Sequence, residues 1–268
     1  MALLAVIGAG AVIDQARHGI DDGGRSASQA QPVVQAVADR SPCSRPLRHP
    51  DPVILVPGTF AATSWDVIGP ALLRRGYCVF TLSYGNAGTL DIAGSAHQLA
   101  AAVGHVLART GAHQVAIVGH SEGGMMPRYY IKRLGGAGKV SDLVALAPSN
   151  HGTTNMLTLA GAAYGCTACA QQFAWNSKFL AGLNAGDEAP PPVDYTVVQT
   201  RLDEVVTPYT SAFLSGPRAR VTDVTLQDRC PGDAVDHVDV PTDRVAVQWV
   251  ENALAVRGPA DPRFRPRC

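Results

Sequence analysis

The fold is decided by the stretch Val115-Ala116-Ile117-Val118-Gly119-His120-Ser121-Glu122-Gly123-Gly124. An apolar run ends here in a Gly-x-Ser-x-Gly pattern and passes directly into a helix-like segment. This order is typical of a sharp strand-to-helix turn that strains a serine and exposes its hydroxyl above a sheet. The glycines leave room for the turn, and the new helix directs free backbone N–H groups towards a developing negative charge. We therefore interpret Ser121 as a nucleophile.

The size and composition of the chain favour a single exported domain. Its 268 residues suit one large α/β domain better than two small ones, and they allow a substantial core to be buried. Lys plus Arg and Asp plus Glu number 22 each, so no net charge points to nucleic acid or to an anionic membrane as a partner. The six cysteines form an even set, which favours disulfides and hence secretion.

The N-terminal segment has the character of a leader. Residues 2–13 form an apolar run as long as a signal-peptide core, but no positive charges precede it. The run is too short to cross a bilayer, and the residues up to about 48 are rich in Asp, Gly, Ser, Gln and Pro. We predict a poorly ordered leader with an incomplete signal peptide over 1–42 and a catalytic domain over 43–268. The alternative is a buried N-terminal helix.

Short apolar runs alternate with helix-like segments after the leader. The predicted strands are 53–56, 78–82, 115–118, 143–147, 195–200 and 221–226, and the predicted helices are 65–75, 91–110, 125–134 and 242–256. This alternation predicts a parallel sheet flanked by helices. Residues 148–192 break the rhythm with small residues, two cysteines and a triple proline, and we interpret about 151–192 as a cap inserted over the sheet.

A histidine near the C-terminus completes the pattern begun by the serine. In enzymes with this elbow the chain order is nucleophile, acid, histidine. Of the eight histidines, only His151 and His237 follow Ser121, and only His237 lies beyond the last predicted strand with a carboxylate before it. An imidazole activates a serine hydroxyl by accepting its proton, which it later returns to the leaving alcohol. We predict that His237 is this general base.

The acid is expected directly after the predicted strand 195–200, where Asp203 and Glu204 are adjacent. We predict Asp203, because a short carboxylate held by the loop backbone can fix the imidazole tautomer and stabilise the imidazolium. Glu204 remains the alternative. Asp236 is disfavoured, since adjacent residues do not easily bring a carboxylate and the ring of His237 into line for a hydrogen bond.

Two backbone N–H groups are candidates for an oxyanion hole. One belongs to Glu122, the residue after the nucleophile, and the other to the loop after the first predicted strand, where Gly58 and Thr59 stand. Thr59 is able to donate by its backbone and by its hydroxyl. The alternative for Thr59 is an ordinary threonine of a turn.

Four segments resemble, in order, segments of the secreted serine lipases of class 2, which include fungal lipase B and its bacterial relatives. They are 55–59, which resembles the oxyanion loop, 119–124, the elbow, 147–153, the loop after the next strand, and 200–208, the acid loop. The resemblance spans roughly 43–268. It implies the α/β-hydrolase fold, with a mostly parallel central sheet flanked by helices and a small cap. It also implies hydrolysis of triacylglycerols or other carboxylic esters through an acyl-enzyme, without a metal or an organic cofactor.

Three residues depart from the pattern of fungal lipase B. Phe60 stands where that family has a glycine, His120 where it has a tryptophan, and Glu122 where it has a glutamine. We predict that Phe60 and His120 contact substrate and tune the acyl or alcohol preference. A carboxylate at position 122 disfavours oxyanion charge unless its side chain points away.

The cysteines are expected to form three disulfides. The resemblance implies the pairs Cys43 with Cys78, Cys230 with Cys268, and the remaining Cys166 with Cys169. The spacing of the last two residues, Cys-x-x-Cys, leaves open half a zinc site or a redox pair.

The insertion carries apolar side chains that we interpret as contacts between cap and core, with a lipid-touching face as the alternative. They are Met156, Leu157, Leu159, Phe173, Trp175, Phe179 and Leu180. We predict a monomer whose partners are an ester or lipid substrate and, transiently, lipid surfaces. The rival interpretations are a carboxylesterase for short soluble esters, an acyltransferase or polyester hydrolase, and a non-catalytic binding protein of the same fold.

Overall fold

A single mixed sheet organises the protein in this computed structural model, which describes residues 33–36, 43, 48–155, 165–174 and 176–268. The strand order is β1-β3-β2-β4-β5-β6-β7, and every neighbouring pair is parallel except β1 with β3. The strands are β1 (Val33–Ala36), β2 (Val53–Val56), β3 (Val79–Ser83), β4 (Val115–His120), β5 (Val140–Leu146), β6 (Asp194–Gln199) and β7 (Val221–Thr225). The predicted fold class is therefore confirmed.

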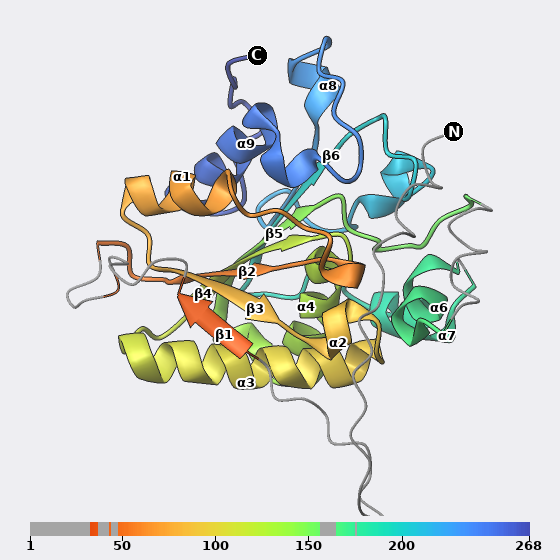
Figure 1. Ribbon diagram of the computed structural model, residues 1–268. Helices are drawn as coiled ribbons and strands as arrows, with labels where there is room; N and C mark the ends of the chain where they lie inside the picture. Colours follow the sequence, from red (N-terminus) through yellow and green to blue (C-terminus); the bar gives the residue numbers. More distant parts are fainter. Residues whose placement is uncertain (1–32, 37–42, 44–47, 156–164, 175) are drawn as a thin grey trace, which may run out of the picture.

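Helices lie on both faces of this sheet (Figure 1). The α-helices are α1 (Ile68–Arg75), α2 (Gly85–Gly88), α3 (Ile92–Thr110), α4 (Glu122–Arg133), α6 (Thr167–Phe173), α7 (Lys178–Asn184), α8 (Leu226–Arg229) and α9 (Arg244–Ala255). The 3₁₀ turns are η1 (Thr59–Ala61), η2 (Gly136–Gly138), η3 (Tyr209–Ala212) and η4 (Val240–Thr242). None of the described helices combines the length and the apolar character needed to span a membrane.

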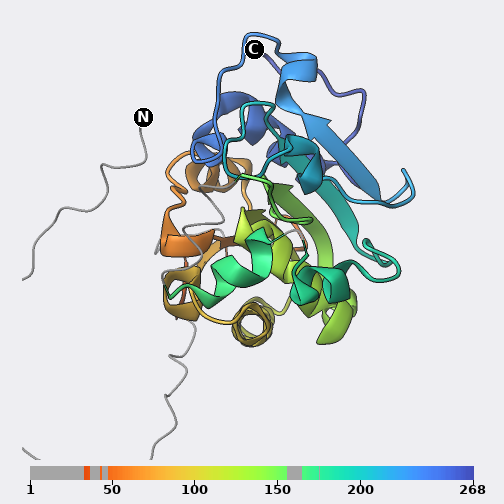
Figure 2. The same cartoon turned by 90° about the vertical axis from the view of Figure 1, so that its right-hand side faces the viewer.

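The sheet separates two apolar cores. Because side chains of a strand alternate between its faces, Ile54 and Val56 of β2 join the core under α3 and α4, whereas Val53 and Leu55 join the core under α1 and α9. Figures 1 and 2 show α1 and α9 together on one side of the sheet and α3 on the other. Both faces of the central strands are buried, which explains why these strands are continuous apolar runs in the sequence.

Local signals fix the ends of the main helices. The side chain of Asp91 accepts a hydrogen bond from the Gly94 N–H at the start of α3, and Gly111 ends the helix in the left-handed conformation. Asp243 caps α9 in the same way. Helix α4 begins at Glu122, three residues before the predicted start, because the strand-to-helix turn leaves no loop after β4.

The structure differs from the predicted leader at residues 33–36 and describes part of the predicted cap. We expected a poorly ordered leader through residue 42, but residues 33–36 form β1 and pair with β3, whose edge otherwise presents unpaired N–H and C=O groups. In the predicted cap, α6 and α7 pack against α3 and α4, and Phe173 and Leu180 are buried in the core as predicted. Residues 2–13 and the predicted cap residues Met156, Leu157, Leu159 and Trp175 lie outside the described residues.

Three disulfides tie loops and the C-terminus to the domain. The structure forms Cys43–Cys78, Cys166–Cys169 and Cys230–Cys268, the pairs that the resemblance implies. All six cysteines are paired. Cys166 and Cys169 are therefore not available as thiolates for a zinc site in this structure.

Each disulfide is expected to stabilise the fold, and the stabilisation should be larger where the loop that it closes is longer. Replacing Cys230 and Cys268, which are 38 residues apart, by serine should lower the free energy of unfolding by about 4 kcal/mol. The matched double variant at Cys166 and Cys169, 3 residues apart, should lose about 2 kcal/mol. Urea unfolding of the two variants measures the difference, and an equal loss in both would contradict the chain-entropy argument.

Candidate active site

The turn between β4 and α4 forces Ser121 into a strained conformation. Its backbone has φ 53° and ψ −122°, outside the regions that side-chain-bearing residues prefer. A Cβ on Gly119 would lie 1.8 Å from the Gly123 carbonyl oxygen, and a Cβ on Gly123 would lie 2.2 Å from the carbonyl oxygen of Val56. Neither glycine is therefore replaceable, and the close backbone contact fixes the position of Ser121 over the C-terminal edge of the sheet.

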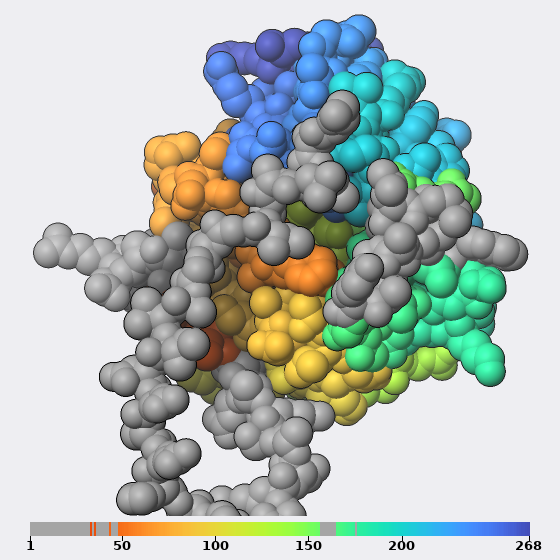
Figure 3. All heavy atoms as spheres, turned by 45° about the vertical axis from the view of Figure 1, so that its right-hand side comes forward, coloured from red at the N-terminus to blue at the C-terminus, as the bar shows by residue number. Residues whose placement is uncertain are grey.

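The structure brings together Ser121, His237 and Asp203. The His237 Nε2 lies 3.2 Å from the Ser121 Oγ, and the His237 Nδ1 lies 2.8 Å from the Asp203 Oδ2. All three residues are buried. Ser121 follows β4, Asp203 follows β6 and His237 follows β7. The segments that carry these loops, coloured yellow-green, cyan and blue, adjoin on one face of the molecule (Figure 3).

Asp203 is the carboxylate that contacts the imidazole. Its second oxygen, Oδ1, accepts hydrogen bonds from the backbone N–H groups of Val205 at 2.9 Å and Val206 at 2.7 Å. The adjacent Glu204 is exposed. Asp236 instead accepts backbone N–H bonds from the two residues after His237 and so stabilises a local turn.

The loop that carries His237 is anchored to the end of β6. Thr200 donates its hydroxyl to the carbonyl oxygen of Val235 at 2.7 Å, and the side-chain amide of Gln227 donates to the Thr200 Oγ1 at 2.8 Å. These two bonds, one buried and one partly buried, hold the loop that carries His237 against β6, the strand before the loop that carries Asp203.

His120 connects this base loop to the loop after β2. Its Nε2 lies 2.9 Å from the carbonyl oxygen of His237, and its Nδ1 lies 2.9 Å from the Thr63 Oγ1, which also accepts from the Gly58 N–H. A carbonyl only accepts, so Nε2 carries the proton and Nδ1 accepts from the threonine hydroxyl. Burial lowers the pKa of His120 to about 3. The imidazole is thus a neutral bridge between two loops.

The Glu122 side chain does not point away from the site. Its carboxyl is buried, and its Oε2 lies 2.6 Å from the Thr59 Oγ1 and 3.2 Å from the Gln172 Nε2. Gln172 also donates to the Thr59 Oγ1 at 2.7 Å. Sequence reasoning missed Gln172, because its partners are 50 and 113 positions away and no local pattern marks the contact. Burial raises the pKa of Glu122 to about 8.

The comparison with known proteins identifies the family. The model of the family described as Lipase (class 2) matches residues 50–250. The chain belongs to this family. Lipase B of Aspergillus fumigatus has a similar structure, with a TM-score of 0.76 and 26% identity over 85% of this chain and 57% of that lipase. The chain therefore spans a little over half the length of that protein.

Two further solved structures resemble this class 2 lipase family member. They are the mature form of lipase BlEst2 of Bacillus licheniformis (TM-score 0.62, 15% identity, 84% of this chain and 98% of that one) and an esterase of Exiguobacterium antarcticum (TM-score 0.54, 13% identity, 84% and 96%). At these identities they show the α/β-hydrolase fold alone. The predicted membership of the class 2 lipases is confirmed by the family match.

The Phe60 side chain is exposed, and its backbone is strained. It is 62% exposed and has φ 63°, and Ala61 also has a positive φ of 49°. A bulky residue in this region is a conformational outlier, so the turn after Thr59 holds an aromatic ring in solvent at a cost in backbone energy. That Phe60 and His120 contact substrate stays a prediction.

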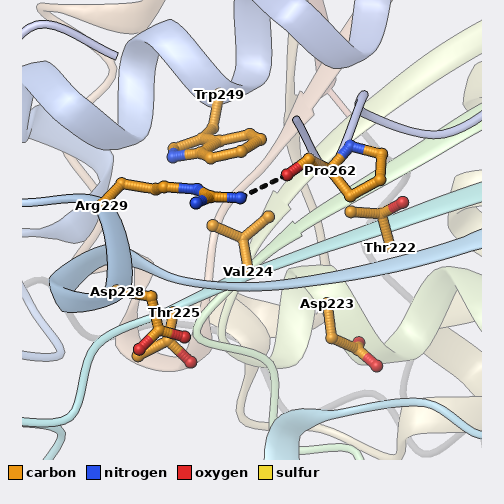
Figure 4. A pocket seen from close by; sticks show the side chains of 8 residues that line it. All are labelled: Thr222, Asp223, Val224, Thr225, Asp228, Arg229, Trp249 and Pro262. Atoms are coloured by element: carbon orange, nitrogen blue, oxygen red, sulfur yellow. Dashed lines mark hydrogen bonds between the residues drawn. The ribbon is translucent and has the colours of Figure 1, made fainter. Parts of the chain in front are cut away.

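A separate pocket of about 250 Å³ lies along β7 at the edge of the sheet (Figure 4). Residues of β7, α8 and α9 line it, and the Arg229 guanidinium donates across it to the carbonyl oxygen of Pro262 at 2.6 Å. None of Ser121, Asp203 and His237 lines this pocket. Within the described part of the chain, no group of three or more His, Cys, Asp or Glu residues is arranged to hold a metal ion.

The buried, neutral imidazole of His120 predicts a specific pH dependence of the free energy of unfolding. Below pH 6.5 the unfolded chain binds a proton at His120 that the folded protein does not bind. The wild-type free energy of unfolding should therefore fall with decreasing pH through this group by about 1.4 kcal/mol per pH unit between pH 6 and 4. His120→Gln should lack this contribution, so the stability difference between wild type and variant should shrink as the pH falls.

Urea unfolding at pH 4, 5, 6 and 7 measures this difference. The exposed His113 provides the matched control, because His113→Gln removes an imidazole without removing a buried bridge. Parallel stability curves for wild type and His120→Gln would show that the ring is not held neutral by burial.

Proposed function

We propose that the protein is a secreted serine lipase that hydrolyses carboxylic esters, triacylglycerols among them, through an acyl-enzyme intermediate. The observation that carries the proposal is the alignment of Ser121, His237 and Asp203, with separations of 3.2 Å and 2.8 Å between the interacting atoms. These distances fit proton transfer from the hydroxyl to Nε2 and orientation of the ring by the carboxylate.

The reaction proceeds in two halves. In the first, the Ser121 Oγ attacks the ester carbonyl carbon while His237 Nε2 takes the hydroxyl proton. The tetrahedral intermediate then expels the alcohol, which receives that proton, and the acyl group stays on Ser121. In the second half, water attacks the acyl-enzyme, His237 accepts a proton from the water, and the fatty acid leaves as the proton returns to the serine oxygen. Asp203 stays ionised and stabilises the imidazolium.

The oxyanion of each intermediate forms beside the start of α4. Glu122 is the first residue of that helix, and the N–H groups of a first helical turn have no partner within the helix. Its N–H and the positive end of the helix dipole therefore favour negative charge there. Thr59 is the proposed second donor, since its side chain already contacts Glu122.

Apolar side chains around the site support a water-insoluble substrate. Among the described residues, the large apolar side chains that are most exposed include Phe60 at 62%, Leu202 at 51% and Val238 at 50%. Each is adjacent in sequence to a residue of the proposed site. Single exposed apolar residues are ordinary, but three that are sequence neighbours of proposed site residues fit transient contact with a lipid surface better than they fit a small soluble ester.

Secretion and a monomeric state belong to the same proposal. Three disulfides between described cysteines fit an oxidising compartment, because cytosolic thiols are kept reduced. The sheet with helices on both faces forms two cores within one chain, so burial of the apolar strands does not require a second copy.

A fluorophosphonate probe tests the proposed nucleophile. Wild type should be modified at Ser121, as located by mass mapping of the labelled peptide, and Ser121→Ala should not be modified. Asp203→Asn should slow labelling on the order of 10⁴-fold, because the imidazole loses its correct tautomer.

Glu204→Gln is the matched control, because it removes the neighbouring exposed carboxylate and should label at a rate close to that of wild type. A folded wild type that takes no probe would favour a non-catalytic binding protein. Equal slowing by Asp203→Asn and Glu204→Gln would remove Asp203 from its proposed role.

Substrate profiling tests the lipase assignment. Wild type should hydrolyse emulsified triglyceride and p-nitrophenyl esters with acyl chains longer than six carbons. The double variant Leu202→Ser/Val238→Ser should lose more activity on the emulsion than on p-nitrophenyl acetate, because it weakens contact with the lipid surface. Val256→Ser, a change at the 37% exposed residue after α9, is the control and should preserve the ratio.

The rival activities give different results in this profile. No turnover of acyl chains above six carbons would replace the lipase assignment by a short-chain carboxylesterase. Transfer of the acyl group to an added alcohol in preference to water, followed by product analysis, would instead identify an acyltransferase.

A further inference from the structure

The carboxyl of Glu122 is a buried ionisable group that the proposed mechanism does not use. Only the backbone N–H of this residue has a role there, yet its side chain is 0% exposed. The Oε2 atom contacts the Thr59 Oγ1 and the Gln172 Nε2, whereas the Oε1 atom is buried without a hydrogen-bond partner. A full negative charge with one unsatisfied oxygen is costly in such a place, and a neutral carboxylic acid is much less so.

The groups that face this carboxyl only partly offset a charge: hydrogen bonding by Thr59, Gln172 and Tyr84 lowers its pKa, but burial raises that pKa by more. Thr59 of η1 and Gln172 of α6 are neutral donors, and Gly88 of α2 approaches with its backbone. The titratable group that faces it is Tyr84, just before α2, whose own pKa is raised well above its ordinary value by burial. Burial is the largest influence on Glu122 and raises its pKa to about 8, so the acid is neutral in the neutral pH range.

The orientation of the Gln172 amide is fixed by a third residue. Ser149 donates its hydroxyl to the Gln172 Oε1 at 2.7 Å, which leaves the amide Nε2 to face Thr59 and Glu122. Gln172 is 0% exposed. One acceptor position of the Thr59 hydroxyl is therefore always occupied by an amide N–H, at 2.7 Å.

Whether the Thr59 hydroxyl can donate a hydrogen bond towards substrate depends on whether Glu122 is protonated. A hydroxyl donates one hydrogen bond and accepts two. When Glu122 carries a proton on Oε2, it donates along the 2.6 Å contact and fills the second acceptor position, so the threonine proton turns towards the substrate side. When Glu122 is ionised, the threonine proton is drawn to the carboxylate along the same contact. The heavy-atom positions suit both states.

We propose that Glu122 is a positioning residue that, in its neutral acid form, orients the Thr59 hydroxyl as a second donor to the oxyanion, and that ionisation of Glu122 withdraws this donor. The inference rests on the proposed function, because it concerns the same oxyanion at Ser121. It assigns to the glutamate a role through its side chain in addition to the role of its backbone N–H.

The first test is the pH dependence of kcat/KM for p-nitrophenyl butyrate between pH 6 and 9.5, corrected for hydrolysis without enzyme. Wild type should lose activity as the pH rises through about 8, since the neutral acid that supports catalysis disappears. Glu122→Gln should lose this alkaline decrease, because an amide donates to Thr59 and does not titrate. An unchanged alkaline decrease in Glu122→Gln overturns the inference.

A second variant makes the test independent of any change at position 122. Thr59→Val removes the hydroxyl at nearly constant shape and should cost about 10²–10³-fold in kcat/KM at pH 6.5. The ratio of wild type to Thr59→Val should fall roughly 30-fold between pH 6.5 and pH 9.5, because with a pKa of about 8 only about 3% of Glu122 stays neutral at pH 9.5. In the Glu122→Gln background the cost of Thr59→Val should be the same at every pH. A ratio for wild type that does not change with pH overturns the inference.

Labelling of the same preparations with the fluorophosphonate probe separates the two proposals. Wild type that neither hydrolyses the ester nor is modified at Ser121 overturns the proposed function and this inference with it. Wild type that is labelled and active, but shows either of the contrary pH results, overturns the inference and leaves the proposed function standing.

Discussion

The structure depends on one close backbone contact, between the turn that holds Ser121 and the end of β2. Gly123 has no space for a Cβ because the carbonyl oxygen of Val56 would lie 2.2 Å from it. This contact places the first turn of α4 against the loop that begins at Pro57, so the serine, the N–H of Glu122 and Thr59 are positioned by the same packing. The strained φ of Ser121 persists because the strands on either side of β4 leave the turn no alternative path.

The other half of the site is held by hydrogen bonds between loops rather than by packing alone. His120 links the Thr63 hydroxyl to the carbonyl of His237, and Thr200 links β6 to the base loop. The bond from His120 to His237 is buried and the other two are partly buried, so each is stronger than it would be in water. A site assembled from loops after three strands thereby gains the rigidity that oxyanion stabilisation requires, since donors that must reorganise contribute little.

The sequence predicted what depends on local pattern and chain order. The apolar runs predicted the central strands, Gly119 and Gly123 predicted the turn, and the order of the strands selected Asp203 and His237. It did not predict β1, whose pairing depends on the free edge of β3. It also gave no sign that Gln172 reaches Glu122 or that His120 bridges two loops, because these contacts join residues 50 and 117 positions apart. Local periodicity carries no information about such partners.

Glu122 shows why the charge of a site residue cannot be assigned from the sequence alone. In the sequence it is an acid beside the nucleophile, which predicts repulsion of an oxyanion unless the side chain points away. In the structure the side chain points inward, yet burial outweighs the hydrogen bonds to neutral side chains and favours the neutral acid. A neutral carboxylic acid offers an O–H donor and an acceptor oxygen, and a side-chain amide offers N–H donors and an acceptor oxygen, so the neutral acid can donate to the threonine as a glutamine would. The physical difference between the two residues is that the acid keeps a titration step near neutral pH.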